Sequence, residues 1–184
     1  MASGQSRVAR LVMSVSARDH VQGPPTAPAT MVEYGDYECP FCGQAYPIVK
    51  AVQARLGPRM RYVFRHFPLS EIHPRALQAA EVAEAAGAQG RFWQMHDLLF
   101  ENQPELSDPD LVRYATALGL DVPRVVTDVG EHVYEPRIRE DFMSGVRSGV
   151  NGTPTFFING IRHDGPWDVV TLTNALLAVA RVPA

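Results

Sequence analysis

The stretch "GDYECPFCGQ", residues 35–44, contains the only two cysteines of the chain, Cys39 and Cys42. The segment before it, "TMVEY" at 30–34, is short, partly β-branched and bounded by a glycine, which predicts a strand. The apolar residues after it recur at helical spacing up to a Gly-Pro pair, which predicts a helix over about 40–56. The two cysteines are therefore expected where a strand passes into a helix.

Cys39 would occupy the cap position of this helix, because Pro40 suits the first helical position, where no N–H is needed. There, free backbone N–H groups and the positive end of the helix dipole favour the thiolate of Cys39. Cysteines in such positions have pKa values of roughly 3.5 to 7.5, against about 8.5 for an ordinary cysteine. Because the thiolate is the species that attacks disulfides, Cys39 is predicted to be the nucleophile. Cys42, within the first turn, would resolve the mixed disulfide.

Two structural roles for the pair are alternatives. A structural zinc ion needs four ligands, and the chain has no further cysteine. Among the six histidines, His66 and His73 are too far apart in sequence for the usual spacing, so zinc would require distant histidines or a second chain. A permanent disulfide between Cys39 and Cys42 would close a very small loop and constrain little of the unfolded chain. Redox chemistry is therefore the preferred interpretation.

The rest of the chain predicts a mixed α/β domain. "MRYVFRHF" at 60–67 alternates as a strand does, and several amphipathic segments follow within 68–149, which we interpret as a helical insertion. "TPTFFINGIRH" at 153–163 has β character, and its Asn-Gly dipeptide predicts a hairpin. A closing helix is expected from Asp168. Strands from both ends of the sequence must then pair around one core.

Residues 1–29 are predicted to be a loosely ordered arm, since three prolines near its end prevent a helix. Residues 30–184 are expected to form one domain, interrupted by the insertion. The apolar part of the arm, Leu11 to Val15, is too short for a secretory signal, so we expect a cytoplasmic location. In that compartment ordinary thiols stay reduced, and a Cys-x-x-C pair suggests redox chemistry or metal binding.

Composition excludes two classes of partner. Seventeen Lys and Arg against twenty Asp and Glu leave a formal net charge of -3, so the basic surface of a nucleic-acid-binding protein is not expected. No stretch approaches the roughly eighteen consecutive apolar residues of a membrane span. We therefore expect neither a nucleic acid nor a membrane as a partner.

Two segments, "EYGDYECPFC" at 33–42 and "GTPTFFINGIRHDG" at 152–165, resemble the DsbA-like thioredoxin-fold thiol-disulfide oxidoreductases, particularly a branch with a helical insertion. The resemblance covers about residues 18–182. It implies an α/β thioredoxin-like fold, in which helices flank a central mixed sheet and a helical subdomain is inserted. It also implies exchange with protein thiols or disulfides, an unidentified redox partner and no organic cofactor.

The resemblance further implies a substrate-binding surface. Thr153 and Pro154 are expected to face the sulfurs, with Pro154 in the cis form and Thr153 towards the substrate. An extended substrate strand would then pair with the backbone of the residue before the proline. Pro40 and Phe41, between the cysteines, are assigned to the same surface. From the residues alone, the alternative is that Pro154 simply starts an edge strand.

Glu33 takes the position at which these proteins carry a buried acid. With its pKa raised by burial, its carboxyl group could pass a proton to or from Cys42. The alternative is an ordinary solvent-facing carboxylate. The dipeptide between the cysteines departs from the family pattern, because it lacks the histidine that strongly oxidising relatives carry there. That departure argues against a very oxidising potential.

We therefore predict a protein thiol-disulfide oxidoreductase in which Cys39 reacts, Cys42 resolves and Glu33 handles protons. One alternative is a thioredoxin-fold module that senses redox state or binds a partner without turnover. Another is an isomerase or transferase that acts on glutathione, although that class typically replaces the cysteine pair with a serine.

Overall fold

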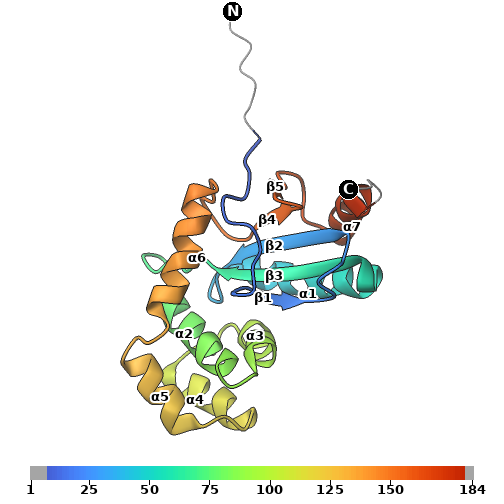
Figure 1. Cartoon of the computed structure of the whole chain (residues 1–184). Helices are drawn as coiled ribbons and strands as arrows, with labels where there is room; N and C mark the ends of the chain where they lie inside the picture. Colours follow the sequence, from blue (N-terminus) through green and yellow to red (C-terminus); the bar gives the residue numbers. More distant parts are fainter. Residues whose placement is uncertain (1–7, 181–184) are drawn as a thin grey trace, which may run out of the picture.

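The computed structural model describes residues 8–180 and has a five-stranded mixed sheet at its centre (Figure 1). The strands are β1 His20–Gln22, β2 Ala29–Gly35, β3 Met60–His66, β4 Thr155–Ile158 and β5 Ile161–Arg162, in the spatial order β1-β3-β2-β4-β5. The helices are α1 Pro40–Leu56, α2 Ala76–Gly87, α3 Phe92–Glu101, α4 Asp108–Ala117, α5 Val122–Gly130, α6 Glu135–Arg147 and α7 Val169–Ala180. The expected mixed α/β architecture with inserted helices is confirmed.

The centre of the sheet is the parallel pair β2 and β3, which α1 connects as a crossover helix. β4 pairs antiparallel with the other side of β2, and its register places Thr155 opposite Tyr34. This pairing brings the residues just before β4 next to the loop that leaves β2. Segments separated by more than one hundred residues in sequence therefore meet at one end of the sheet.

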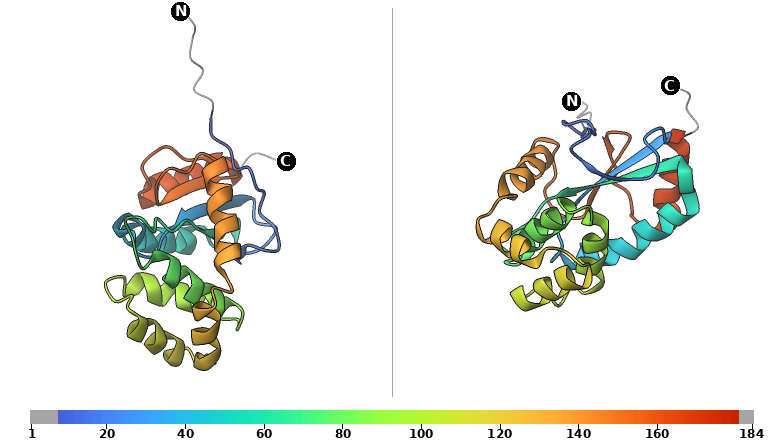
Figure 2. Two further views of the ribbon diagram at one scale, coloured as in Figure 1. Left: turned by 90° about the vertical axis from the view of Figure 1, so that its left-hand side faces the viewer. Right: turned by 60° about the horizontal axis from the view of Figure 1, so that its bottom comes forward.

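Successive side chains of β2 and β3 point to opposite faces of the sheet, and both faces are buried. Met31 and Phe64 face the core formed with α1 and α7, whereas Val32 and Val63 belong to a second core on the opposite face. Figure 2 shows α1 on one side of the sheet, with α6 and the N-terminal segment on the other. Because side chains alternate, Glu33 faces the same side as Met31, towards α1.

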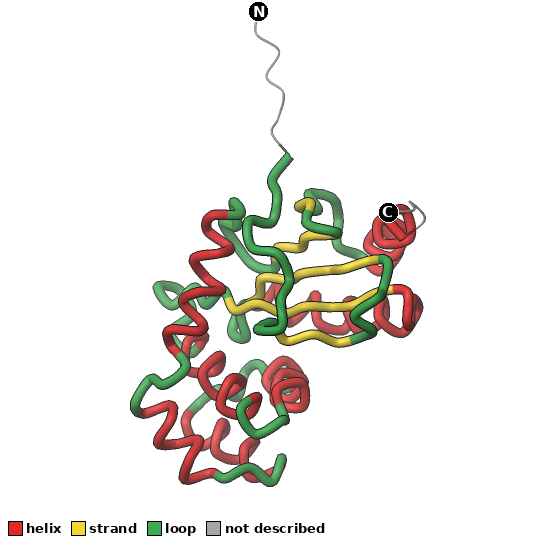
Figure 3. The backbone as a smooth tube through the Cα atoms, in the orientation of Figure 1, coloured by secondary structure: helices red, strands yellow, loops and turns green. Residues whose placement is uncertain are grey.

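The inserted helices α2 to α5 form a group beside the sheet, between β3 and α6 in the chain (Figure 3). A capping box is present at the start of α4, where Ser107 and Asp110 satisfy each other's backbone N–H groups. Within the described residues, no helix has the length and apolar character needed to cross a membrane.

The N-terminal segment differs from its prediction as a loosely ordered arm. From residue 8 onwards it lies against the sheet, where β1 pairs antiparallel with β3 and Arg10 forms a bridge to Ile161. The buried guanidinium of Arg65 donates hydrogen bonds of 2.7 and 3.2 Å to the carboxylate of Asp19. A buried charge needs such a partner, so this ion pair holds the segment in place. Residues 1–7 of the predicted arm lie outside the described residues.

The hairpin that the Asn-Gly dipeptide predicts is present between β4 and β5. Asn159 and Gly160 have φ values of 45° and 78°, which glycine and asparagine tolerate best. Asn159 also accepts a 2.7 Å hydrogen bond from the backbone N–H of Thr30 through its side-chain oxygen. The turn is therefore tied to the start of β2.

Candidate active site

The two cysteines lie at the junction of β2 and α1. Cys39 is the cap residue of α1, with an extended backbone (φ −68°, ψ 120°), and Pro40 takes the first helical turn's opening position. Cys42 lies within that turn and is fully buried. Both cysteines are free thiols. The Cys39 sulfur is therefore placed at the end of the helix where backbone N–H groups have no helical partner.

The pKa of Cys39 is lowered to about 5 from an ordinary 9.0. The largest cause is a hydrogen bond from the Cys42 thiol, which stabilises the thiolate against the opposing effect of burial. A hydrogen bond from the side chain of Thr153 and the backbone N–H groups of Cys42 and Phe41 contribute less. The sequence predicts that the end of the helix lowers the pKa of Cys39. In the structure the neighbouring thiol of Cys42 lowers it more than the backbone N–H groups of the helix end do.

The pKa of Cys42 is shifted in the opposite direction. Burial, the hydrogen bond that it gives to Cys39, and the negative charges of Glu33 and Cys39 raise its pKa well above the ordinary value. The backbone N–H of Asp36 donates a 3.5 Å hydrogen bond to the Cys42 sulfur. Near neutral pH the pair therefore consists of one thiolate and one thiol, which is the combination that attack and resolution require.

Glu33 is buried behind the pair rather than exposed to solvent, with 2% of its surface accessible. The hydroxyl of Tyr62 donates a 2.7 Å hydrogen bond to Glu33 Oε2. Burial raises the pKa of Glu33 to about 7, the Tyr62 hydrogen bond lowers it, and the charge of Cys39 raises it further. This carboxyl group can therefore take up or release a proton near neutral pH.

Thr153 and Pro154 lie beside the cysteines, as the pairing of β4 with β2 requires. The Thr153–Pro154 peptide bond is cis. The Cys39 sulfur lies 3.4 Å from the carbonyl oxygen of Thr153, to which Cys39 donates a hydrogen bond in its protonated form. Pro40 is exposed, and Phe41 is 59% exposed. The structure thus brings Pro40, Phe41, Thr153 and Pro154 together beside Cys39 at one end of the sheet, with the apolar surface of Phe41 exposed.

Asp36 is a site residue that the sequence analysis missed. Its buried carboxylate accepts hydrogen bonds through Oδ1 from the backbone N–H groups of Glu38 (2.8 Å) and Cys39 (3.2 Å). Oδ2 accepts from the backbone N–H of Leu69 (2.9 Å) and lies 2.8 Å from His73 Nδ1. One carboxylate therefore fixes both the turn before Cys39 and the segment after β3. The signal was an aspartate three residues before a helix cap, which is typical of such turns.

Gln103 is a second missed residue, and it comes from the insertion. Its side-chain nitrogen donates hydrogen bonds to the carbonyl oxygens of Tyr37 (2.9 Å) and Cys39 (2.7 Å). Gly43 leaves room for this side chain, because a Cβ at that position would overlap the Gln103 amide. No sequence pattern predicts a contact between residues so far apart in the chain.

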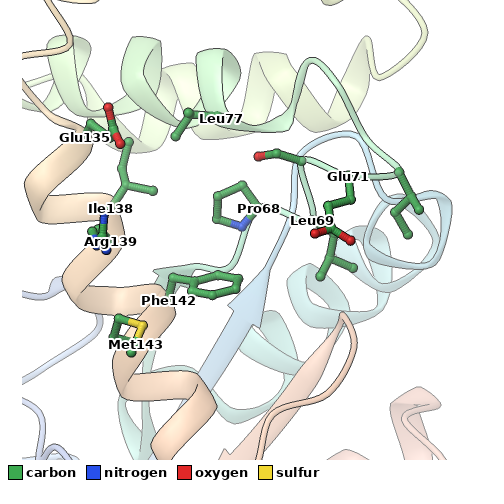
Figure 4. Close-up of a pocket in the computed structure, with 11 residues that line it drawn as sticks. Pro68, Leu69, Glu71, Leu77, Glu135, Ile138, Arg139, Phe142 and Met143 are labelled. Carbon is green, nitrogen blue, oxygen red and sulfur yellow. The ribbon is translucent and has the colours of Figure 1, made fainter.

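A groove of about 580 Å³ is lined by none of the residues assigned to the site. Pro68 and Leu69 form one wall, and Ile138, Phe142 and Met143 of α6 form the other (Figure 4). Leu69 is also the residue whose backbone N–H binds Asp36. The groove is therefore joined to the active-site turn through one short segment.

In the part of the chain that the structure describes, no histidine converges with the cysteines as a zinc ligand. Among residues 8–180, the one convergent group of metal-ligand side chains consists of His20, His66 and Glu84 and includes neither cysteine. The distant histidines that a zinc site would require do meet, but at another place in the fold.

A family model described as "Thioredoxin" matches residues 16–177. Among solved structures, a thioredoxin-like oxidoreductase from Silicibacter pomeroyi DSS-3 is 26% identical and superposes with a TM-score of 0.80, covering 91% of this chain and 95% of that one. BdbD from Bacillus subtilis superposes with a TM-score of 0.82 at 20% identity, covering 90% of this chain and 94% of that one, and shows the same fold.

Curated relatives are more similar in sequence but much longer. A protein of a Mycobacterium species (strain KMS), named Na(+)/H(+) antiporter NhaA 1, is 47% identical over 163 residues, which are 88% of this chain and 27% of that protein. NhaA 3 of Salinispora tropica is 49% identical over 161 residues, which are 88% of this chain and 24% of that protein. The chain therefore spans about a quarter of the length of these relatives.

Proposed function

The chain belongs to the thioredoxin family, and from this membership and the geometry of Cys39 and Cys42 we infer that it exchanges disulfides with protein substrates. The expected thioredoxin-like fold, with the resemblance to DsbA-like proteins, is confirmed. The observation that carries the proposal is that the pKa values of the two thiols are shifted in opposite directions. Cys39 is ionised near neutral pH, and Cys42 is held protonated beside it.

In the first step the Cys39 thiolate attacks one sulfur of a substrate disulfide. The substrate S–S bond breaks, the other substrate sulfur leaves as a thiolate, and a mixed disulfide joins Cys39 to the substrate. The low pKa of Cys39 supports this role, because it keeps the attacking form populated.

In the second step Cys42 attacks the Cys39 sulfur. Its thiol proton must leave as the new bond forms, and Glu33, with a pKa of about 7, is the proposed acceptor. The bond between Cys39 and the substrate breaks, and the substrate leaves with both sulfurs reduced. The same steps in reverse oxidise a substrate dithiol.

The proposed substrate is a polypeptide in an extended conformation, bound along the Thr153 backbone. The carbonyl oxygen of Thr153 lies within hydrogen-bonding distance of Cys39, which supports this position. Pro40 and Phe41 would contact the residues that flank the substrate cysteine, since both are exposed next to Cys39. Ion antiport belongs to the names of the longer relatives, of which this chain spans about a quarter.

The proposal is tested by the two single cysteine variants in an insulin-reduction assay. We expect Cys39→Ser to abolish exchange and Cys42→Ser to accumulate mixed disulfides that a non-reducing gel resolves. Thr127→Ser, an exposed change on α5, is the matched control and should keep the original rate.

The same assay separates the proposal from its alternatives. Full turnover in either cysteine variant would contradict the assignment. A module that only senses redox state or binds a partner would not reduce insulin at all. A transferase would bind glutathione, so saturable glutathione binding with no insulin reduction would favour that class.

A further inference from the structure

Three side chains from three separate elements converge away from the cysteines. They are His20 of β1, His66 at the end of β3 and Glu84 of α2. Both imidazoles direct Nε2 at the same oxygen, Glu84 Oε1, and each lies 2.8 Å from it. The three ligand atoms lie within 4.8 Å of one another.

Aromatic packing fixes the orientation of both imidazole rings. The His20 ring stacks on Phe92 with a centroid distance of 3.4 Å and an interplanar angle of 4°. Gly87 permits this approach, because a Cβ there would press on His20 Cε1 at 3.3 Å. The His66 ring is enclosed by edge contacts with Phe64 and Phe92. Ligands whose rotamers are already held by packing lose little freedom when an ion binds.

The burial of the three residues differs in a way that suits an open metal site. His66 and Glu84 are buried, whereas the side chain of His20 is 20% exposed and leaves a path from solvent. His66 Nδ1 is buried and has no hydrogen-bond partner among the described residues. The hydrogen bond to Glu84 places the proton on Nε2, and Nδ1 can take up that proton when an ion replaces it on Nε2.

We propose that His20, His66 and Glu84 form a binding site for a divalent transition-metal ion, with Zn²⁺ as the best match. Two imidazole nitrogens and one carboxylate oxygen are ligands that Zn²⁺ accepts, and three protein ligands leave a fourth position for water. Zn–N and Zn–O distances of about 2.0 to 2.2 Å require ligand atoms roughly 3.3 Å apart. The two imidazole nitrogens, now 2.8 Å from Glu84 Oε1 and within 4.8 Å of each other, would therefore move away from that oxygen and towards one another.

Coordination replaces two hydrogen bonds to Glu84 by three bonds to the ion. Each imidazole binds as the neutral form through Nε2, so the proton on that nitrogen moves to Nδ1 or leaves to solvent. The bound ion would connect β1, β3 and α2. The insertion would then be fastened to the sheet and to the N-terminal segment at one point, with the His66 ring 5.9 Å from Tyr37 of the active-site turn.

The test uses the full-length chain without a histidine tag, in which Cys39→Ser and Cys42→Ser remove the thiols that would themselves bind Zn²⁺. Titration with Zn²⁺ by calorimetry should give one ion per chain. His20→Gln should weaken the affinity at least about 100-fold, since changes even beyond the ligands typically weaken binding 10- to 100-fold. The matched control is His132→Gln. His132 lies 3.0 Å from Glu81, a residue of α2 like Glu84, and within residues 8–180 no third metal-ligand side chain converges on this pair.

A second measurement needs no ligand variant, in case His20→Gln or Glu84→Gln fails to fold. Nuclear magnetic resonance of the same double-serine chain loaded with Co²⁺ should show paramagnetic shifts for the rings of His20 and His66. The inference is overturned if Zn²⁺ shows no saturable binding, if His20→Gln and His132→Gln bind alike, or if the shifted rings belong to other histidines.

Discussion

At the scale of single residues, the ionisation of Cys39 depends most on the thiol of Cys42. Replacing Cys42 by alanine removes that hydrogen bond and leaves the end of the helix unchanged. We expect the pKa of Cys39 to rise by about one unit, since one hydrogen bond to a charged group is worth about 1.5 kcal/mol.

The rate of alkylation by iodoacetamide as a function of pH measures this change. The midpoint should lie near pH 5 in the original chain and shift upwards in Cys42→Ala. Phe41→Ala is the control, because it keeps the backbone N–H that faces Cys39. An unchanged midpoint in Cys42→Ala would mean that the backbone amides alone set the pKa.

Glu33 gives the resolution step its own pH dependence. If its ionised form accepts the proton of Cys42, the rate of resolution rises with pH through a midpoint near 7. The Tyr62 hydrogen bond lowers the pKa of Glu33, so Tyr62→Phe should move this midpoint upwards by about one unit. Glu33→Gln should remove the inflection and slow resolution about 100-fold.

Stopped-flow decay of a preformed mixed disulfide measures this rate. Tyr114→Phe is the control, because its hydroxyl donates to the carbonyl oxygen of Glu105 on the insertion. If the resolution rate of Glu33→Gln depended on pH as it does in the original chain, Glu33 would have no role in the mechanism.

The site residues differ in how much of the fold is needed to predict them. Cys39, Cys42 and Pro40 could be assigned from spacing alone, because a helix cap is a local structure. Glu33, Thr153 and Pro154 needed a family resemblance, since burial and sheet pairing decide their positions. Gln103 could not be found at all, because its contacts with the active-site turn depend on how the insertion packs.

At the scale of elements, the start of α1 is held by a residue of the insertion. Gln103→Ala would leave the carbonyl oxygens of Tyr37 and Cys39 without their side-chain donor. Cys39 keeps the hydrogen bond from the backbone N–H of Gly43, so the loss falls on Tyr37. We expect the free energy of unfolding to fall by about 2 kcal/mol, since an unpaired buried polar group costs about 1 to 3 kcal/mol.

Urea unfolding measures this loss. Gln44→Ala on the exposed face of α1 is the matched control and should change stability by less than about 0.5 kcal/mol. Equal effects of the two variants would show that Gln103 does not support the turn.

Most elements could be predicted because their boundaries carry local signals. The helix expected over 40–56 is α1, with a proline at its first position and glycine after its last. The Asn-Gly turn is likewise local. β1 was missed because "HVQ" has no pattern of its own and becomes a strand only by pairing with β3. The prolines after it correctly exclude a helix but give no information about that pairing.

At the scale of the whole molecule, reduction of the cysteine pair should make stability depend on pH. Folding lowers the pKa of Cys39 from 9.0 to about 5 in the reduced chain. Its contribution to the free energy of unfolding is therefore fully present above pH 9, decreases as the pH falls, and is absent below about pH 5. The oxidised chain has no such contribution.

Between about pH 5.5 and pH 7.5 the reduced chain should therefore gain up to about 2.7 kcal/mol relative to the oxidised chain, less the part that solvent near the sulfur screens. Urea unfolding of both forms at several pH values measures this difference. The disulfide also stabilises the oxidised chain by constraining its unfolded state. This contribution is the same at every pH, so it does not affect how the difference between the two forms changes with pH. A difference that stays constant with pH would contradict the low pKa of Cys39.

The architecture of the whole molecule followed from the order of its elements. A strand-helix-strand unit, a helical block and a final hairpin with a helix leave few ways to build one sheet. The convergence of His20, His66 and Glu84 could not be foreseen in this way, because it depends on the docking of β1 and of α2 against the same end of β3.

The N-terminal segment touches both outermost borders of the sheet. Through β1 it covers β3, and near Ile161 it exchanges backbone hydrogen bonds with the hairpin, from Leu11 to Gly160 and from Arg162 to Ala9. An uncovered border offers a template on which another chain can add a strand. The strand at the edge beyond β3 is β1, which has three residues and is too short to pair with a strand of another chain. The same short stretch that completes the fold therefore also leaves neither border of the sheet open to strand addition.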